Sequence, residues 1–223
     1  MKRTHSAKPV VQTRASQAKL SPGQALELLK AGNERFVKGK MLNRDLREQV
    51  SATAGGQYPY AVILSCQDSR TSAEVLFDLN KGDAFSIRIA GNVVNEDVLG
   101  GLEFSTRLMG ARLIAVIGHT RCGAIRGAID NAELGNLTAL LRKIRPAVES
   151  TLADGWSEGA VNGDNRKLVE AVAKANVLLA MRQIRERSPV IRDMLEAKDE
   201  KERVGLVGGM YNLATGRVKF YED

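Results

Sequence analysis

The chain has 223 residues, of which 43% are hydrophobic and 26% charged, enough for one compact, soluble domain. No apolar run approaches the roughly twenty residues of a membrane-spanning helix, which argues against a membrane protein. The formal net charge is +7, but residues 1–20 carry five Lys or Arg and no acid, so the remainder is close to neutral and offers no basic surface for nucleic acid.

The N-terminal segment differs in composition from the rest of the chain. Residues 1–20 are expected to be a flexible basic tail, and residues 21–223 a single domain. The tail lacks the apolar core of a secretory signal, but it is similar to a transit peptide in containing Arg and no acid. We expect a cytoplasmic protein, with a periplasmic or organellar location as the alternatives that this tail leaves open.

The first predicted helix begins at Ser21. Ser21 occupies the cap, Pro22 the first turn and Gln24 the position three beyond the cap, and apolar residues then recur on one face until Gly39. A polar connector follows. Residues 60–64 are continuously apolar, which is typical of a strand buried on both faces in a parallel sheet.

Strand and helix patterns then alternate as far as residue 130. Helices are expected at 72–79 and 97–109, strands at 84–89 and 113–118, and a further helix opens at Cys122 and Gly123. Later segments predict helices at 137–150 and 166–187, a break at Ser188-Pro189, and two final strands joined at 214–216. This order predicts an α/β fold: a mostly parallel central sheet with flanking helices, an N-terminal helical arm, and a C-terminal hairpin extending the sheet.

Two cysteines and a histidine lie where parallel strands end. Cys66 and His119 each follow a predicted strand, and Cys122 lies three residues beyond His119. Because parallel strands end at one edge of a sheet, the three side chains can converge. Two thiolates and an imidazole suit Zn²⁺ and leave a fourth position for water, as in a catalytic site. The alternative is two free buried thiols.

Asp68 and Arg70 follow Cys66 closely. Asp68 could occupy the fourth metal position in a closed form of the site, or accept a hydrogen bond from water there. Arg70 could hold that carboxylate with two parallel hydrogen bonds. The alternative is an ordinary surface salt bridge in a loop.

The segments "CQDSR" and "GHTRCGA" resemble the Cys-x-Asp-Ser-Arg and His-x-x-Cys signatures of the β-class carbonic anhydrases, over about residues 55–130. This resemblance implies a lyase that reversibly hydrates carbon dioxide to bicarbonate and a proton, with zinc providing the attacking hydroxide. It implies one zinc per subunit, held by Cys66, His119 and Cys122, with Asp68 and Arg70 as the catalytic pair. It also implies a homodimer or a larger homo-oligomer.

The resemblance further implies a substrate pocket. Gln57 and the backbone amide of Gly123 would bind bicarbonate, and Phe85 and Ala90 would wall the site for carbon dioxide. Phe104 stands where a tyrosine is common and would remove one hydroxyl. Ile63 stands where members with an allosteric bicarbonate site carry tryptophan, which favours an open site with water as the fourth ligand.

Other functions remain as alternatives at this point. A similar site hydrolyses carbon disulfide or carbonyl sulfide in related proteins. A non-catalytic zinc-binding protein is a second alternative, although an open fourth position argues against it. Nucleic-acid binding has only the basic tail in its favour.

Overall fold

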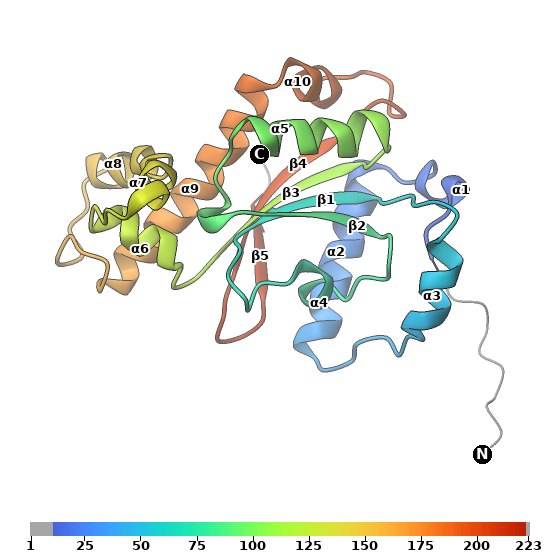
Figure 1. Ribbon diagram of the computed structural model, residues 1–223, viewed down its shortest axis with the longest axis horizontal. Coiled ribbons are helices and arrows are strands. Elements are labelled where there is room, and N and C mark those ends of the chain that lie inside the picture. Colours follow the sequence, from blue (N-terminus) through green and yellow to red (C-terminus); the bar gives the residue numbers. More distant parts are fainter. Residues whose placement is uncertain (1–10, 222–223) are drawn as a thin grey trace.

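A five-stranded sheet organises the computed structural model, which describes residues 11–221 (Figure 1). The strands are β1 (Ala61–Ser65), β2 (Ala84–Arg88), β3 (Leu113–His119), β4 (Gly205–Tyr211) and β5 (Val218–Tyr221). Their order is β2-β1-β3-β4-β5; the first four are parallel, and β5 pairs antiparallel with β4. The predicted α/β fold with a C-terminal hairpin is therefore confirmed.

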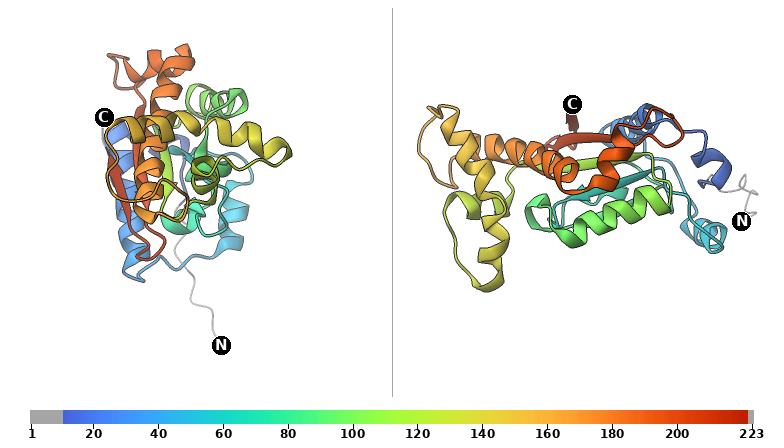
Figure 2. Two further views of the ribbon diagram at one scale, coloured as in Figure 1. Left: turned by 90° about the vertical axis from the view of Figure 1, so that its left-hand side faces the viewer. Right: turned by 90° about the horizontal axis from the view of Figure 1, so that it is seen from above.

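Helices cover both faces of the sheet and its carboxyl edge (Figures 1 and 2). They are α1 (Arg14–Gln17), α2 (Pro22–Val37), α3 (Leu46–Thr53), α4 (Ala73–Leu76), α5 (Glu96–Glu103), α6 (Gly123–Ile129), α7 (Gly135–Arg142), α8 (Arg145–Ala153), α9 (Arg166–Arg187) and α10 (Pro189–Leu195). A 3₁₀ turn, η1 (Ala90–Asn92), follows β2, and a π-helical segment, η2 (Phe104–Leu108), continues α5. None of the helices within residues 11–221 combines the length and hydrophobicity needed to cross a bilayer.

Three apolar clusters divide the interior. One packs α5, α10 and the second half of α9 on one face of the sheet, and another packs α2 and α4 on the opposite face. The third contains Cys66 and Cys122 and packs α6, α7 and α8 against the first half of α9. These three helices form a lobe at one end of the molecule (Figure 2). Helix α9 therefore links the sheet to the lobe.

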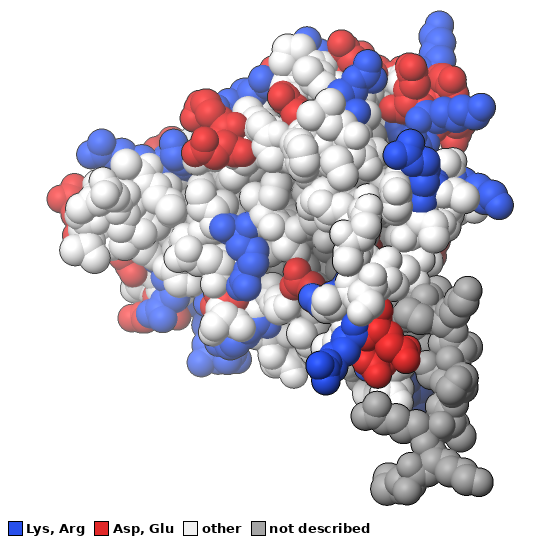
Figure 3. Space-filling view, turned by 45° about the vertical axis from the view of Figure 1, so that its right-hand side comes forward, with Lys and Arg blue, Asp and Glu red and all other residues white. Residues whose placement is uncertain are grey.

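The central strands β1 and β3 are apolar because neither of their faces contacts solvent. Every residue of β1 and β3 is buried, whereas β2 lies at an edge of the sheet and alternates between half-buried and exposed residues. Continuous apolar runs are typical of such central parallel strands. On the molecular face shown in Figure 3, Lys and Arg side chains are interspersed with Asp and Glu around a broad uncharged area.

Helix α2 begins as its sequence predicts. The Gln24 backbone N–H donates to Ser21 Oγ at 3.2 Å, and the Ser21 N–H donates to Gln24 Oε1 at 2.9 Å. These bonds satisfy donors that would otherwise have no partner at the helix start. Gly39 follows the helix with a φ of 63°, a conformation that glycine adopts without a steric penalty.

The structure differs from the sequence-based expectation at the start of the chain. Residues 14–17 form α1 rather than part of a flexible tail, and the buried Gln17 amide donates to the carbonyls of Pro59 at 2.7 Å and Met109 at 2.8 Å. These contacts attach the segment to the domain. The expected tail boundary at residue 20 therefore lies too late; residues 1–10 lie outside the described part.

Three other segments differ from the expected elements. Helix α3 occupies part of the expected connector between α2 and β1, capped by Asp45. The helix expected at 137–150 is two helices, because Pro146 stands in the first turn of α8 and cannot donate a backbone hydrogen bond to a continuing helix. Helix α4 is shorter than expected and ends at Leu76.

Gly32 is required where α2 crosses the end of α4. A Cβ atom at this position would lie 1.9 Å from the carbonyl oxygen of Phe77, so the two backbones would have to separate. Gly23, in the first turn of the same helix, has only Ser21 Oγ nearby, at 3.9 Å from such an atom. The two glycines therefore differ in what a methyl group would cost.

We predict that Gly32→Ala lowers the free energy of unfolding by at least about 2 kcal/mol, because the added methyl group overpacks a backbone contact. Gly23→Ala, the matched control, should leave it unchanged or raise it by about 0.5 kcal/mol, because alanine favours the helix. Urea unfolding of both variants measures this. Equal stability of the two variants would contradict the packing of α2 on α4.

Asp78 is a fully buried carboxylate held by two arginines. Its oxygens accept hydrogen bonds from Arg35 Nε at 2.6 Å, from Arg44, and from the Leu42 backbone N–H at 3.2 Å. Burial by itself raises the pKa of Asp78, but the hydrogen bonds from Arg44 and Arg35 lower it overall. The ionised carboxylate therefore ties α2 and the following loop to the end of α4.

The lowered pKa of Asp78 gives a pH-dependent contribution to stability. This contribution is present above the unfolded-state pKa of about 3.9 and is lost as pH falls through the still lower folded-state pKa. We predict that Asp78→Asn costs about 3 kcal/mol of unfolding free energy from pH 8 to pH 5. Below about pH 4 the difference from the wild type should shrink. Urea unfolding across this range tests the prediction, and a difference that grows in acid would contradict it.

Candidate metal centre

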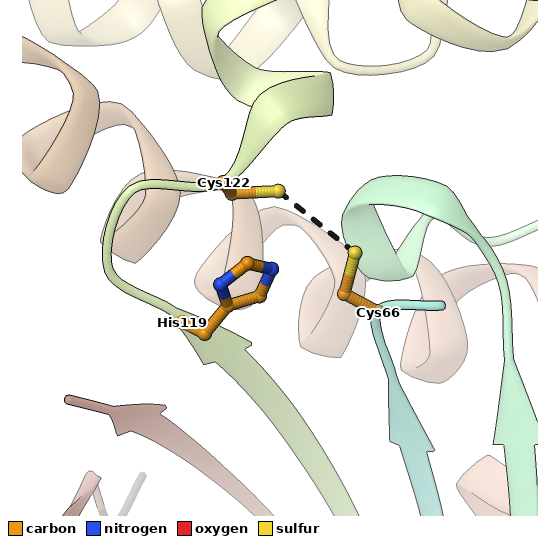
Figure 4. Close-up of side chains that lie close together, drawn as sticks. All are labelled: Cys66, His119 and Cys122. Carbon is orange, nitrogen blue, oxygen red and sulfur yellow. Dashed lines mark hydrogen bonds between the residues drawn. The ribbon is translucent and has the colours of Figure 1, made fainter. Parts of the chain in front are cut away.

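Cys66, His119 and Cys122 lie together at the carboxyl edge of the sheet (Figure 4). Cys66 directly follows β1, His119 is the last residue of β3, and Cys122 precedes the first residue of α6. Their possible ligand atoms all lie within 4.8 Å of one another, and the two Sγ atoms are 3.9 Å apart. All three residues are buried. The convergence predicted from spacing is confirmed.

Strand register explains this convergence. Ser65 pairs with Ile117 in the parallel ladder, so Cys66 and His119 emerge at the same edge. The chain then turns through Arg121, whose φ is 57°, and brings Cys122 back toward Cys66. The Thr120 N–H donates to the Tyr211 carbonyl at 2.9 Å, which holds this loop against the end of β4.

The imidazole of His119 is oriented as a ligand would be. Its Nδ1 lies 2.9 Å from the Thr120 carbonyl oxygen, and because a carbonyl can only accept, Nδ1 carries the proton. Its Nε2 is buried and has no hydrogen-bond partner within residues 11–221. A buried nitrogen lone pair without a partner is costly in a protein interior unless something binds it. A metal ion would satisfy it.

The sulfur separation also fits a metal. A distance of 3.9 Å is far longer than the roughly 2.05 Å of a disulfide bond. Two sulfurs at about 2.3 Å from one tetrahedral zinc would lie roughly 3.8 Å apart. The donor set of two thiols and one imidazole is the combination that soft and borderline metals prefer. The residues present therefore fit a metal site.

The two thiols share one proton. A hydrogen bond from Cys122 lowers the pKa of Cys66 to about 4, against the opposing effect of burial. The same hydrogen bond to Cys66, together with burial, raises the pKa of Cys122. A metal that binds both sulfurs as thiolates must displace this proton.

Asp68 and Arg70 form the pairing that the sequence predicts. Arg70 Nε donates to Asp68 Oδ1 at 2.9 Å and Arg70 Nη2 to Oδ2 at 2.7 Å, while the Arg70 backbone N–H donates to Oδ1 at 3.0 Å. These hydrogen bonds hold the pKa of Asp68 well below its usual range. The Asp68 side chain is mostly buried, with 16% exposed, and Arg70 is 56% exposed.

Further contacts hold the loop that carries Asp68. The Thr71 hydroxyl lies 3.0 Å from the Cys66 carbonyl and 2.8 Å from the Asp68 carbonyl. Arg88, at the end of β2, donates to the same two carbonyls at 3.2 and 2.6 Å. Thr71 and Arg88 are not among the site residues expected from the sequence. Both side chains bond to backbone carbonyls, which every residue has, so the sequence contains no pattern that would predict these contacts.

The residues expected to line the substrate pocket differ in exposure and in their position relative to Cys66. The rings of Phe85 and Phe104 are in edge contact, with centroids 5.9 Å apart, and Phe104 is 46% exposed. Ala90 is buried in the turn after β2, and Gly123 is exposed at the start of α6. Gln57 precedes the amino end of β1 and lines a separate hollow, so one chain does not bring it to Cys66. Its role stays a prediction.

An α/β sheet that carries a buried Cys-His-Cys group and an Asp-Arg pair at its carboxyl edge is the arrangement of a metal-dependent enzyme. The carbonic anhydrase family model matches residues 61–218. The chain therefore belongs to the carbonic anhydrase family, in its β class.

Relatives agree with this assignment. The carbonic anhydrase of Mycolicibacterium smegmatis is 33% identical over 202 residues, covering 89% of this chain and 93% of that protein. Carbonic anhydrase 2 of Mycobacterium tuberculosis is 34% identical over 203 residues, covering 88% and 91%. The solved structure of the β-carbonic anhydrase CcaA is similar with a TM-score of 0.67 and 26% identity, covering 88% of this chain and 87% of that one.

We predict that Cys122→Ser weakens zinc binding more than about 100-fold, the upper end of the range for residues that only support ligands. Ser65→Ala is the matched control, because Ser65 precedes Cys66 and its buried hydroxyl has no partner within the described chain. This control should bind zinc like the wild type. Competition with a chromophoric chelator gives the affinities. Wild-type affinity in Cys122→Ser would remove Cys122 from the site.

Proposed function

We propose that this chain is a zinc-dependent carbonic anhydrase that reversibly hydrates carbon dioxide to bicarbonate and a proton. The observation that carries the proposal is the buried His119 Nε2, which has no hydrogen-bond partner in the described part of the chain and lies beside two sulfurs 3.9 Å apart. Family membership supports it independently. Cys66, His119 and Cys122 would hold one zinc ion per chain.

Bound zinc would supply Lewis acidity, which lowers the pKa of water and makes a nucleophile available near neutral pH. The chain's own residues define the geometry around it. Thr120 fixes the His119 ring through Nδ1, so that Nε2 faces the two sulfurs. Three protein ligands leave one position of a tetrahedral metal for the reaction.

Asp68 would orient the reacting water and receive its hydrogen bond. Arg70 keeps this carboxylate ionised and fixes both of its oxygens, so Asp68 can only accept hydrogen bonds at neutral pH. The sequence contains two histidines, His5 and His119, and His119 would be a ligand. No second imidazole in residues 11–223 can therefore carry the proton to solvent, and buffer would take it up.

Carbon dioxide would bind against apolar side chains at the edge of the sheet. Phe85, Ala90 and Phe104 supply these side chains, and the Gly123 amide would bind bicarbonate. Phe104 and Leu108 are 46% and 73% exposed, Phe104 packs on Phe85 of β2, and β2 is an edge strand of the sheet within residues 11–221. A second copy of the chain covering this surface would bury both residues. A role for Gln57 at the site would require it to come from such a second copy.

The direct test combines metal analysis with stopped-flow measurement of carbon dioxide hydration. The purified protein should contain one zinc per chain and accelerate hydration. Removal of zinc by a chelator should abolish the acceleration, and added zinc should restore it. A protein with stoichiometric zinc and no acceleration over the uncatalysed rate would refute the proposed activity.

We predict that Asp68→Asn lowers kcat about 100-fold, since a neutral amide cannot accept the hydrogen bond of the reacting water as strongly as an ionised carboxylate does. Its zinc content should not change, because the three ligands remain. Asp164→Asn is the matched control: Asp164 pairs with Arg126 at 2.7 Å but is 87% exposed. This control should keep the wild-type kcat. Full activity in Asp68→Asn would exclude Asp68 from the mechanism.

A further inference from the structure

A tight turn after β2 brings a backbone amide to Cys66. The Gly91 N–H donates to Cys66 Sγ at 3.4 Å within the buried interior. The Asn92 N–H donates to the Ile89 carbonyl at 2.9 Å and closes this turn around Ala90 and Gly91. The Cys66 sulfur, one of the three candidate ligand atoms, therefore accepts a hydrogen bond from the turn that follows β2.

Glycine is favoured at the centre of this turn. Gly91 has a φ of 65°, in the left-handed region that residues with a Cβ adopt at a cost. A Cβ atom would lie 2.6 Å from Ile144 Cδ1 and 3.3 Å from Ala124 Cβ. Glycine has no side chain whose packing could help to fix its two dihedral angles. The direction of its N–H therefore depends on the hydrogen bonds that hold the backbone of the turn.

Asn176 anchors this backbone by a hydrogen bond. Its side-chain Nδ2 donates to the Gly91 carbonyl oxygen at 2.7 Å, and the residue is only 2% exposed. Asn176 lies in the middle of α9, a helix of 22 residues whose neighbours Val172, Ala173, Val177 and Ala180 are all buried. Asn176 therefore lies on a helix whose position is fixed by extensive packing.

An asparagine here is not explained by the needs of the helix. Asparagine is a poor helix former, and burying its amide costs free energy unless the amide is hydrogen-bonded. The bond to Gly91 offsets this cost. The same bond holds the peptide on one side of Gly91, while the Gly91 N–H on the other side reaches Cys66.

We infer that Asn176 is a positioning residue for the metal centre: by holding the Gly91 carbonyl it restricts the backbone dihedral angles of Gly91, whose N–H points at the Cys66 sulfur. The inference rests on the proposed function only in requiring that Cys66 binds the metal. An N–H donor stabilises the charge on a thiolate and orients the sulfur toward the other two ligands. Loss of the anchor should let Gly91 turn away, leaving the charge on Cys66 less stabilised and its sulfur less well oriented.

The test uses Asn176→Ala and Asn176→Leu, in the full chain, with cobalt as a spectroscopic probe and zinc for affinity. Asn176→Leu keeps the branched shape and the number of non-hydrogen atoms of the side chain, and Asn176→Ala favours the helix, so the two variants stress folding differently. Circular dichroism and thermal unfolding report whether each variant is folded. We expect a shift of the thiolate-to-cobalt absorption bands and a zinc affinity about 10–100-fold weaker than in the wild type.

Asn33→Ala is the matched control. Asn33 is also a buried helical asparagine, and its Nδ2 donates to the carbonyls of Leu76 at 3.0 Å and Gly216 at 2.9 Å, on the opposite face of the sheet from α5. This control should lose thermal stability but keep the wild-type cobalt spectrum and zinc affinity. A purely structural role for Asn176 predicts the same behaviour in all three variants.

Two results would overturn the inference. One is a wild-type cobalt spectrum and zinc affinity in whichever Asn176 variant folds. The other is an equal change in Asn33→Ala. A wild-type protein that binds both metals without hydrating carbon dioxide would refute the proposed activity and leave this inference standing, because the spectrum reports on the ligands alone. A wild-type protein that binds neither metal would refute both.

Discussion

The parallel pairing of β1 with β3 is the interaction on which the site depends. Its register sets Ser65 beside Ile117, so that the residues following each strand meet at one edge. Cys66 arrives there from β1, and His119 and Cys122 from β3 and its turn. A shift in register by one residue would move every side chain of a strand to the opposite face of the sheet, so it would disrupt both buried clusters and separate the ligands at the same time. Folding and assembly of the site are thus one event.

Around this pairing, backbone contacts remove the freedom that the loops would otherwise have. Thr71 and Arg88 hold the carbonyls after β1, Thr120 holds the imidazole, and Asn176 holds the turn at Gly91. Helix α9 contributes the last of these while also packing on the sheet and on the lobe of α6, α7 and α8. The result is a small polar group enclosed by apolar clusters, with the carboxylate of Asp68 at its margin. Such enclosure strengthens electrostatic interactions within the site.

Local signals in the sequence were sufficient for much of this arrangement. The Ser21 cap, the continuous apolar strands and the limits of α9 follow from nearest neighbours along the chain, and so does the spacing of the three metal-binding candidates. What sequence reasoning missed depends on distant partners. Gln17 attaches α1 through carbonyls 42 and 92 residues away, and Asn176 reaches a carbonyl 85 residues away. Side-chain bonds to backbone atoms leave no trace in the identity of the partner residue, so no pattern could predict them. Gln57 is a different case. The family resemblance assigned it to bicarbonate binding, but within one chain it lies near the opposite end of β1 from Cys66.

The central claim is that two thiolates and one imidazole from two separate loops hold a single zinc ion. Zinc K-edge X-ray absorption of the purified protein measures this coordination directly. We expect two sulfur scatterers at about 2.3 Å, together with nitrogen or oxygen scatterers at about 2.0–2.1 Å that bring the number of ligands to four. A shell of nitrogen and oxygen alone, or of four sulfurs, would contradict it.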